Sequence, residues 1–194
     1  DASNMDEDFL QFLEEGHVKT YFGSLPDDMS VFDMLVLSPG VPPQLDFVQE
    51  AAAAGAEIIG ELELAYRMTD AHFAAITGTN GKTTTTTLVG EIFKAAGRKT
   101  SVVGNIGNPV VTEAVSADSD SWMVTEVSSF QLETTRDFRP EVSAILNLTP
   151  DHLNRHKTME AYGNAKARVT VMQSEDEFLI INGVECEPYL TADH

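Results

Sequence analysis

The sequence has few basic residues, one cysteine and no long apolar run. Only 12 of its 194 residues are Lys or Arg, against 31 Asp or Glu, and the formal net charge is −19. Such an acidic chain is not expected to bind nucleic acid through a general basic surface. The single cysteine, Cys186, excludes an internal disulfide and is typical of a reducing compartment. No apolar run approaches the roughly 20 residues of a membrane span, and residues 1–8 are acidic where a signal peptide would be basic. We therefore expect a cytoplasmic protein without a membrane partner.

The most informative segment spans residues 76–87 and reads Ile-Thr-Gly-Thr-Asn-Gly-Lys-Thr-Thr-Thr-Thr-Thr. Gly78 and Gly81 allow a tight turn whose N–H groups point toward an anion, next to the positive end of a helix. Lys82 can reach terminal phosphates, and the hydroxyl of Thr83 can bind magnesium. The alternative is a glycine-rich turn of an ordinary βα unit, because the full P-loop consensus needs a glycine where Ile76 stands. We predict a phosphate site made by Gly78, Thr79, Asn80, Gly81, Lys82, Thr83 and Thr84.

Short apolar runs alternate with helix-spaced patterns along the chain. We predict strands at residues 32–38, 56–60, 73–77, 101–103, 121–127, 142–146 and 177–181. We predict helices at residues 45–54, 61–68, 82–96 and about 159–172, with a short helix within residues 128–135. This alternation indicates a three-layer α/β fold with a mostly parallel sheet. A domain boundary is expected within residues 67–72, which divides the chain into 1–70 and 71–194.

Polar residues follow several of the predicted strands. In a parallel α/β sheet, ligands bind beyond the carboxyl ends of the strands, and Asn105, Glu126 and His152 all lie at such ends, as does the phosphate loop. Glu126 suits a magnesium-linked carboxylate, although a strand-end glutamate can also simply face water. His152 can bind a metal through its neutral imidazole, with Asp151 or another acid orienting it. Lys166 shares a helix face with Tyr162 and would by itself be an exposed lysine.

Several motifs together resemble those of the Mur ligase family, which adds amino acids to the peptidoglycan precursor. The similarity covers roughly residues 33–183, and its motifs are Gly-Thr-Asn-Gly-Lys-Thr at 78–83, Gly-Asn-Ile-Gly at 104–107, Glu-Val-Ser-Ser-Phe-Gln-Leu-Glu at 126–133, Asn-Leu-Thr-Pro-Asp-His at 147–152 and the segment 162–166. Ser38-Pro39-Gly40 is similar to the turn of that family that meets a UDP pyrophosphate. Within the family, segment 126–133 is most similar to that of the D-glutamate-adding members.

The resemblance implies a fold, cofactors and residue roles. It implies a P-loop-type ATPase domain, the Mur ligase central domain, preceded by part of a Rossmann-like N-terminal domain that binds the UDP substrate. ATP phosphates would be bound by Lys82 and its loop, and Mg²⁺ by Thr83 and Glu126, with His152 at a second ion. Lys166 would be a carbamylated metal ligand. The residues that would contact the UDP-muramoyl substrate are Ser38, Pro39, Gly40, Asn105, Ser129 and Gln131.

The implied reaction is ATP-dependent addition of D-glutamate to UDP-N-acetylmuramoyl-L-alanine through an acyl phosphate, in peptidoglycan precursor synthesis. Members of the family are much longer and have three domains. We therefore expect a partial N-terminal domain, a partial central domain, no C-terminal amino-acid-binding domain, and no ligase turnover by this chain alone. The alternatives are another Mur ligase or a folylpolyglutamate synthetase, or a non-catalytic nucleotide-binding module.

Overall fold

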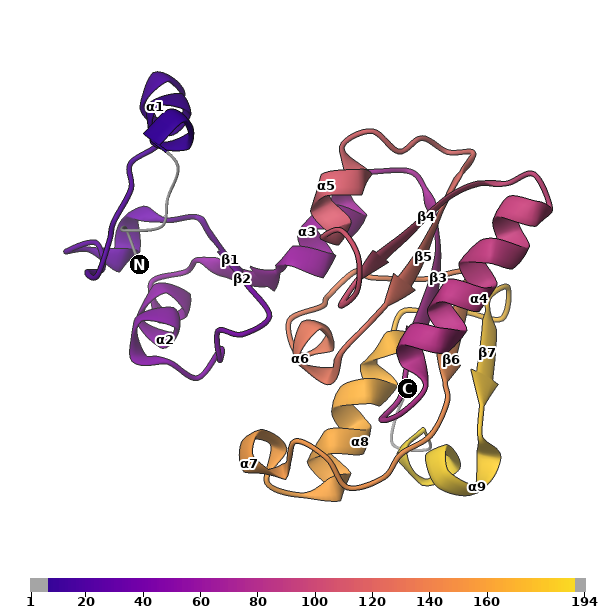
Figure 1. Ribbon diagram of the computed structural model, residues 1–194. Coiled ribbons are helices and arrows are strands. Elements are labelled where there is room, and N and C mark those ends of the chain that lie inside the picture. Colours follow the sequence, from indigo (N-terminus) through magenta and orange to yellow (C-terminus); the bar gives the residue numbers. More distant parts are fainter. Residues whose placement is uncertain (1–6, 191–194) are drawn as a thin grey trace.

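The computed structural model describes residues 7–190, which form two parallel sheets surrounded by helices (Figure 1). The smaller sheet has the order β1-β2, and the larger has the order β4-β5-β3-β6-β7. Every strand pair of both sheets is parallel. The predicted α/β fold with a mostly parallel sheet is confirmed. Within residues 7–190, no helix has the length and apolar character needed to cross a membrane.

The N-terminal part of the chain contains the smaller sheet. Helix α1 (Glu7–Glu15) comes first and was not predicted, followed by a short 3₁₀ turn, η2 (Met29–Val31). Strand β1 (Met34–Leu37), helix α2 (Asp46–Ala53) and strand β2 (Glu57–Gly60) then form a βαβ unit, and helix α3 (Glu61–Arg67) follows β2 directly. Met29, Ala51 and Ala56 make a small core of their own beneath it.

The larger sheet is built around strand β3 (His72–Thr77), which pairs with β5 (Ser121–Glu126) on one side and β6 (Val142–Ile145) on the other. The edge strands are β4 (Lys99–Gly104) and β7 (Phe178–Ile181). The helices of this part are α4 (Lys82–Ala95), α5 (Val110–Ala114), α6 (Ser129–Leu132), α7 (Leu153–His156), α8 (Met159–Ala167) and α9 (Gly183–Cys186). The 3₁₀ turns η3 (Arg168–Thr170) and η4 (Glu187–Tyr189) follow α8 and α9.

Alternate side chains of β3 pack on opposite faces of the sheet, because strand side chains alternate in direction. Ala74 and Ile76 face a core that α4 closes with Val89 and Phe93. Phe73 belongs to the larger core on the other face, to which α3, α5 and α8 contribute. The result is a layer of helices on each face of the sheet, with the carboxyl ends of the strands left for polar loops (Figure 1).

Two local features differ from the sequence-based expectation. The helix predicted at residues 159–172 ends as α8 at Ala167 and continues as a 3₁₀ turn, where Val169 is fully buried in the main core. Helix α3 contributes Leu62 and Ala65 to this same core, so it packs on the larger sheet although it follows the smaller one. The predicted division of the chain near residue 70 stays a prediction.

Candidate active site at the carboxyl ends of the strands

The phosphate loop lies between the end of β3 and the start of α4. Gly78 has φ 145° and Gly81 has φ 80°, conformations that residues with a Cβ rarely adopt. A Cβ on Gly78 would also lie 3.3 Å from the backbone nitrogen of Asn147. Helix α4 begins at Lys82, and the first N–H groups of any helix, here those of Lys82, Thr83 and Thr84, have no acceptor within it. These groups are therefore available to an anion.

The loop that follows β6 supports the phosphate loop. The Asn147 side-chain oxygen accepts hydrogen bonds from the backbone N–H groups of Thr79 (3.1 Å) and Asn80 (2.8 Å). The Thr79 hydroxyl donates to the backbone oxygen of Thr149 and lies 3.1 Å from the Tyr162 hydroxyl. The N–H groups of Thr79 and Asn80 are thus engaged inside the protein. This role of Asn147, which lies within the 147–152 motif, was not predicted.

Lys82 turns back onto its own loop. Its ammonium donates to the backbone oxygen of Thr79 at 3.0 Å. The charge is therefore held beside the helix N-terminus, where a phosphate group would compete with this carbonyl as its partner.

Glu126 is the buried centre of a small polar cluster whose other members, Thr83 and Asn105, are exposed. One of its carboxylate oxygens accepts from the Thr83 hydroxyl at 2.9 Å, and the other accepts from the Asn105 amide at 2.8 Å. Glu126 is 1% exposed, so the alternative of a strand-end glutamate facing water is wrong. The pairing of β3 with β5 sets Glu126 beside Ile76, next to the loop. The structure therefore joins three residues that lie far apart in the sequence.

Lys166 lies inside the protein rather than on its surface. It is 2% exposed, and its ammonium donates to the Thr77 hydroxyl at 3.3 Å and lies over the ring of Tyr162. Burial, and after it the charge of Lys82, lower the pKa of Lys166 to about 7, although Asp151 and Glu126 act in the opposite direction. The interpretation of Lys166 as an exposed lysine is wrong.

His152 sits at the start of α7 with its ring half-exposed. Its backbone has φ 52°, and its Nε2 lies 3.5 Å from a carboxylate oxygen of Asp151. Among residues 7–190, no group of three or more His, Cys, Asp or Glu side chains is arranged to hold a metal ion. Thr83 and Glu126 nevertheless supply the hard oxygen atoms that Mg²⁺ prefers, so this pair fits the ion that the sequence analysis predicted.

Ser129 and Gln131 are buried and already have partners. The Ser129 hydroxyl lies 2.9 Å from His156 Nε2, and the Gln131 side-chain oxygen accepts from the backbone N–H of Ser128, completing a capping box. Burial lowers the pKa of His156, although Glu133 acts to raise it. No role was predicted for His156, which is the last residue of α7, whereas His152 precedes that helix with a left-handed backbone.

Ser38, Pro39 and Gly40 follow β1 on the smaller sheet. They form a turn in which Val41 donates to the backbone oxygen of Ser38 at 2.9 Å. In the part of the chain that the structure describes, no hydrogen bond joins this turn to the phosphate loop. The predicted site residues thus form two groups, one on each sheet.

Comparison with known proteins gives a consistent result. The family model described as "Mur ligase middle domain" matches residues 76–190. A UDP-N-acetylmuramoylalanine--D-glutamate ligase of Alkaliphilus oremlandii is 52% identical over 176 residues, covering 89% of this chain and 39% of the relative. The ligase of that name from Clostridioides difficile is 53% identical over 166 residues, covering 85% and 37%. The chain thus spans well under half the length of these curated relatives.

Solved structures support the fold at lower identity. One is a UDP-N-acetylmuramate:L-alanyl-gamma-D-glutamyl-meso-diaminopimelate ligase from Neisseria meningitides, with a TM-score of 0.55 and 18% identity over 93% of this chain and 61% of that one. Another is the MurF ligase of Thermotoga maritima in complex with ADP, with a TM-score of 0.51 and 17% identity over 84% and 50%. At such identities the similarity concerns the fold alone.

Proposed function

This chain belongs to the Mur ligase family, and from that premise we propose that it is part of an ATP-dependent ligase that adds D-glutamate to UDP-N-acetylmuramoyl-L-alanine. The observation that carries the proposal is the hydrogen-bonded Thr83–Glu126–Asn105 cluster, in which a buried carboxylate joins two exposed polar residues beside the first turn of α4. The identity of about half of the aligned residues with D-glutamate ligases supports the choice of amino acid. The reaction belongs to peptidoglycan precursor synthesis, and we propose that it takes place in the cytoplasm.

ATP would bind with its phosphates at the N-terminus of α4. The free N–H groups of the first helical turn and the Lys82 ammonium supply positive charge there, in a chain whose net charge is −19. Mg²⁺ would be held by Thr83 and Glu126, and when bound it would offset the negative charge of the phosphates. Asn105 would keep the second oxygen of Glu126 in place, because its amide already donates to it.

The reaction has two steps. A carboxylate oxygen of the substrate forms a bond to the γ-phosphorus of ATP, ADP leaves, and an acyl phosphate results. The amine of D-glutamate then attacks the acyl carbon, phosphate leaves, and the amide forms with loss of a proton. Lys82 stabilises the charge that moves during the transfer.

Lys166 would act after carbamylation. The ammonium would first lose one proton, and the neutral Nζ would then form a bond to the carbon of CO₂ and release a second proton, which leaves a carbamate anion. Burial supports this role, because an ammonium that is 2% exposed is poorly solvated. The carbamate and His152 would then contribute to a second metal site.

The substrate would contact both parts of the chain. Residues 1–70 would be a partial UDP-substrate unit, with Ser38, Pro39 and Gly40 at the pyrophosphate. Residues 71–194 would be a partial ATP unit, with Asn105, Ser129 and Gln131 facing the sugar and peptide. For Ser129 to do so, its hydroxyl must exchange its bond to His156 for one to the substrate.

The test is phosphate release from ATP by a protein of the relatives' full length that carries this chain. It is assayed with UDP-N-acetylmuramoyl-L-alanine and a panel of amino acids. We expect release that depends on D-glutamate and is abolished by Lys82→Ala but not by Lys94→Ala, a matched change at an exposed lysine of the same helix. Release that depends on another amino acid would show that the protein is a different Mur ligase. ATP binding without amino-acid-dependent release of phosphate would favour the alternative of a non-catalytic nucleotide-binding module. The 194-residue chain alone should show no turnover.

A further inference from the structure

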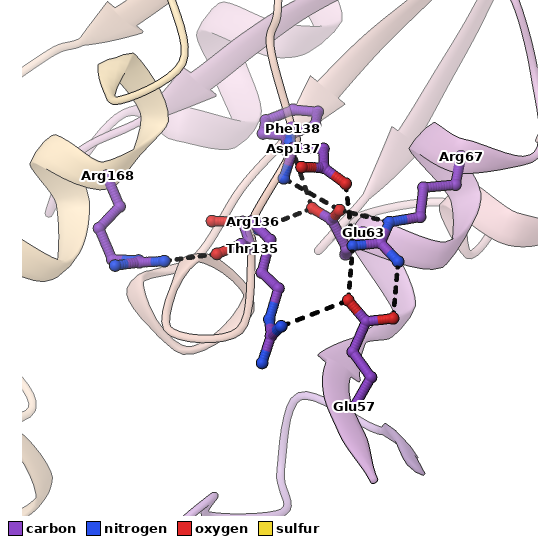
Figure 2. Close-up of polar contacts among 8 residues, drawn as sticks. All are labelled: Glu57, Glu63, Arg67, Thr135, Arg136, Asp137, Phe138 and Arg168. Atoms are coloured by element: carbon purple, nitrogen blue, oxygen red, sulfur yellow. Dashed lines mark hydrogen bonds and ion pairs between the residues drawn. The ribbon is translucent and has the colours of Figure 1, made fainter. Parts of the chain in front are cut away.

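A fully buried carboxylate, Glu63, lies outside the site described above. It is on α3, and its exposed fraction is 0%. One oxygen accepts from the backbone N–H groups of Arg136 (2.9 Å) and Phe138 (3.2 Å), and the other accepts from the backbone N–H of Asp137 (3.0 Å) and from Arg67 Nε (2.7 Å). Figure 2 shows these donors converging on the carboxylate. Glu63 therefore holds three consecutive N–H groups of the segment that leads from α6 to β6.

The same network reaches back to the smaller sheet. Arg67 donates to both carboxylate oxygens of Glu57 on β2, each at 3.0 Å, and lies 3.0 Å from Asp137. Arg136 also approaches Glu57, at 3.4 Å. Strand β2 is thus tied through α3 to the loop at residues 135–138 (Figure 2).

The other side of this loop is tied to Arg168, the first residue of the 3₁₀ turn η3, which follows α8 directly. Arg168 donates through Nε to the backbone oxygen of Leu132 at 2.8 Å, and through its terminal nitrogen to the backbone oxygen of Thr135. In Figure 2, Arg168 approaches Thr135 from the side opposite to Glu63. Arg168 lies two residues after Lys166, so a continuous set of polar contacts runs from β2 through α3 and the loop to the helix that carries Lys166.

The junction of β2 and α3 also packs closely against this segment. A Cβ on Gly60 would lie 2.3 Å from the Thr134 hydroxyl oxygen. Apolar packing alone could hold α3 on the sheet, but it tolerates small shifts. A buried carboxylate with four directional donors is satisfied in one arrangement only, because leaving it partly unpaired in the interior is unfavourable.

We propose that Glu63 is a positioning residue that fixes the smaller sheet relative to the larger one. It would hold the turn at Ser38–Gly40 at the correct separation from Asn105 and α6, so that a single UDP-linked substrate contacts both. This inference rests on the proposed function. ATP binds on the larger sheet alone and should not depend on Glu63.

The test compares Glu63→Gln with Glu61→Gln. Glutamine replaces one acceptor oxygen by an NH₂ group, which cannot accept from the N–H groups of the loop. Glu61 is the matched control, because it is on the same helix and accepts from the backbone N–H of Val111 at 2.6 Å but does not bind the 135–138 loop. Calorimetry with the chain measures its affinity for UDP-N-acetylmuramoyl-L-alanine and for ATP with Mg²⁺. Hydrogen exchange measures protection of the N–H groups of residues 136–138.

We expect Glu63→Gln to weaken binding of the UDP-linked substrate by about tenfold, to leave ATP affinity unchanged within about twofold and to speed exchange at residues 136–138. Glu61→Gln should change none of these. Faster exchange with both affinities unchanged would overturn the proposal, as would equal effects of the two variants. If Glu63→Gln does not fold, Arg67→Gln provides the second variant, since it removes the guanidinium but leaves the three backbone contacts.

A further measurement separates this inference from the proposed function. If the unmodified chain binds ATP but not the UDP-linked substrate, the two affinities cannot be compared, and the assay of phosphate release at full length decides the proposed substrate. The distance between spin labels on Val36 of β1 and Leu88 of α4, both exposed, then tests the positioning directly, with Cys186 replaced by serine. Glu63→Gln should broaden the distance distribution, and an unchanged distribution would refute the role of Glu63.

Discussion

Replacing Lys166 with methionine should change how the stability of the protein depends on pH. Burial lowers the pKa of Lys166 to about 7 from 10.5 for an ordinary lysine. The folded pKa is therefore below the unfolded one, and between these values the unfolded chain binds more protons than the folded chain. The free energy of unfolding then rises with pH across this window and falls as pH decreases toward 7. Methionine has a similar length and does not ionise.

The magnitude follows from the size of this shift. Each pH unit within the window corresponds to about 1.4 kcal/mol, so Lys166 should remove roughly 3–4 kcal/mol of stability at pH 7 relative to pH 10. The variant also lacks the hydrogen bond to Thr77, which lowers its free energy of unfolding by about 1 kcal/mol at both pH values. We therefore compare the free energies of unfolding of Lys166→Met and the unmodified chain. The difference between them should favour the variant by roughly 3–4 kcal/mol more at pH 7 than at pH 10.

The assay is urea unfolding at pH 7 and pH 10 in buffers free of CO₂, so that the amine stays unmodified. Lys94→Met is the matched control, because Lys94 is exposed on α4, and it should change the free energy of unfolding equally at both pH values. The reasoning would be refuted if the difference between Lys166→Met and the unmodified chain changed by less than about 1 kcal/mol between the two pH values.

Three further variants test the site. Gly104→Ala should lower the free energy of unfolding by roughly 2–4 kcal/mol in urea, because Gly104 has φ 105° and its Cβ would lie 2.3 Å from the backbone oxygen of Glu126; a loss below about 1 kcal/mol would contradict this geometry. Thr83→Val should weaken ATP binding about tenfold in calorimetry with Mg²⁺ and much less without it; equal effects would exclude Thr83 from the metal site. Tyr162→Phe should lower stability by about 1 kcal/mol, through loss of the contact with the Thr79 hydroxyl at 3.1 Å; an unchanged melting temperature would show that the contact contributes nothing.

Much of the fold could be predicted because its signals are local. Apolar runs bounded by glycine, proline and polar residues gave the strands of both sheets, and the strand expected at residues 73–77 is observed as β3 (His72–Thr77). The helix expected at residues 82–96 is observed as α4 (Lys82–Ala95). Helix α7 was not predicted, since it has only 4 residues and follows His152, whose backbone is left-handed. Such short helices depend on tertiary contacts rather than on periodicity.

The site residues that lie at the carboxyl ends of strands could be predicted. Thr83, Asn105 and Glu126 were expected at one rim, and the structure joins them by hydrogen bonds. Their roles in catalysis stay predictions. Ser129, which the family resemblance places at the substrate, has its side chain directed to His156, and its contact with substrate stays a prediction. The spacing of polar residues along a helix does not show which of their side chains form hydrogen bonds inside the protein.

The sequence by itself determined the phosphate loop, the alternation of strands and helices, and the family, because each depends on residues close together in the chain. The tertiary structure decided which charged groups are buried. Lys166 meets Thr77 across 89 positions of sequence, and Glu63 meets the loop at residues 136–138 across 73 to 75 positions. Lysine and glutamate are usually exposed, so only the packing of distant segments makes these two exceptions.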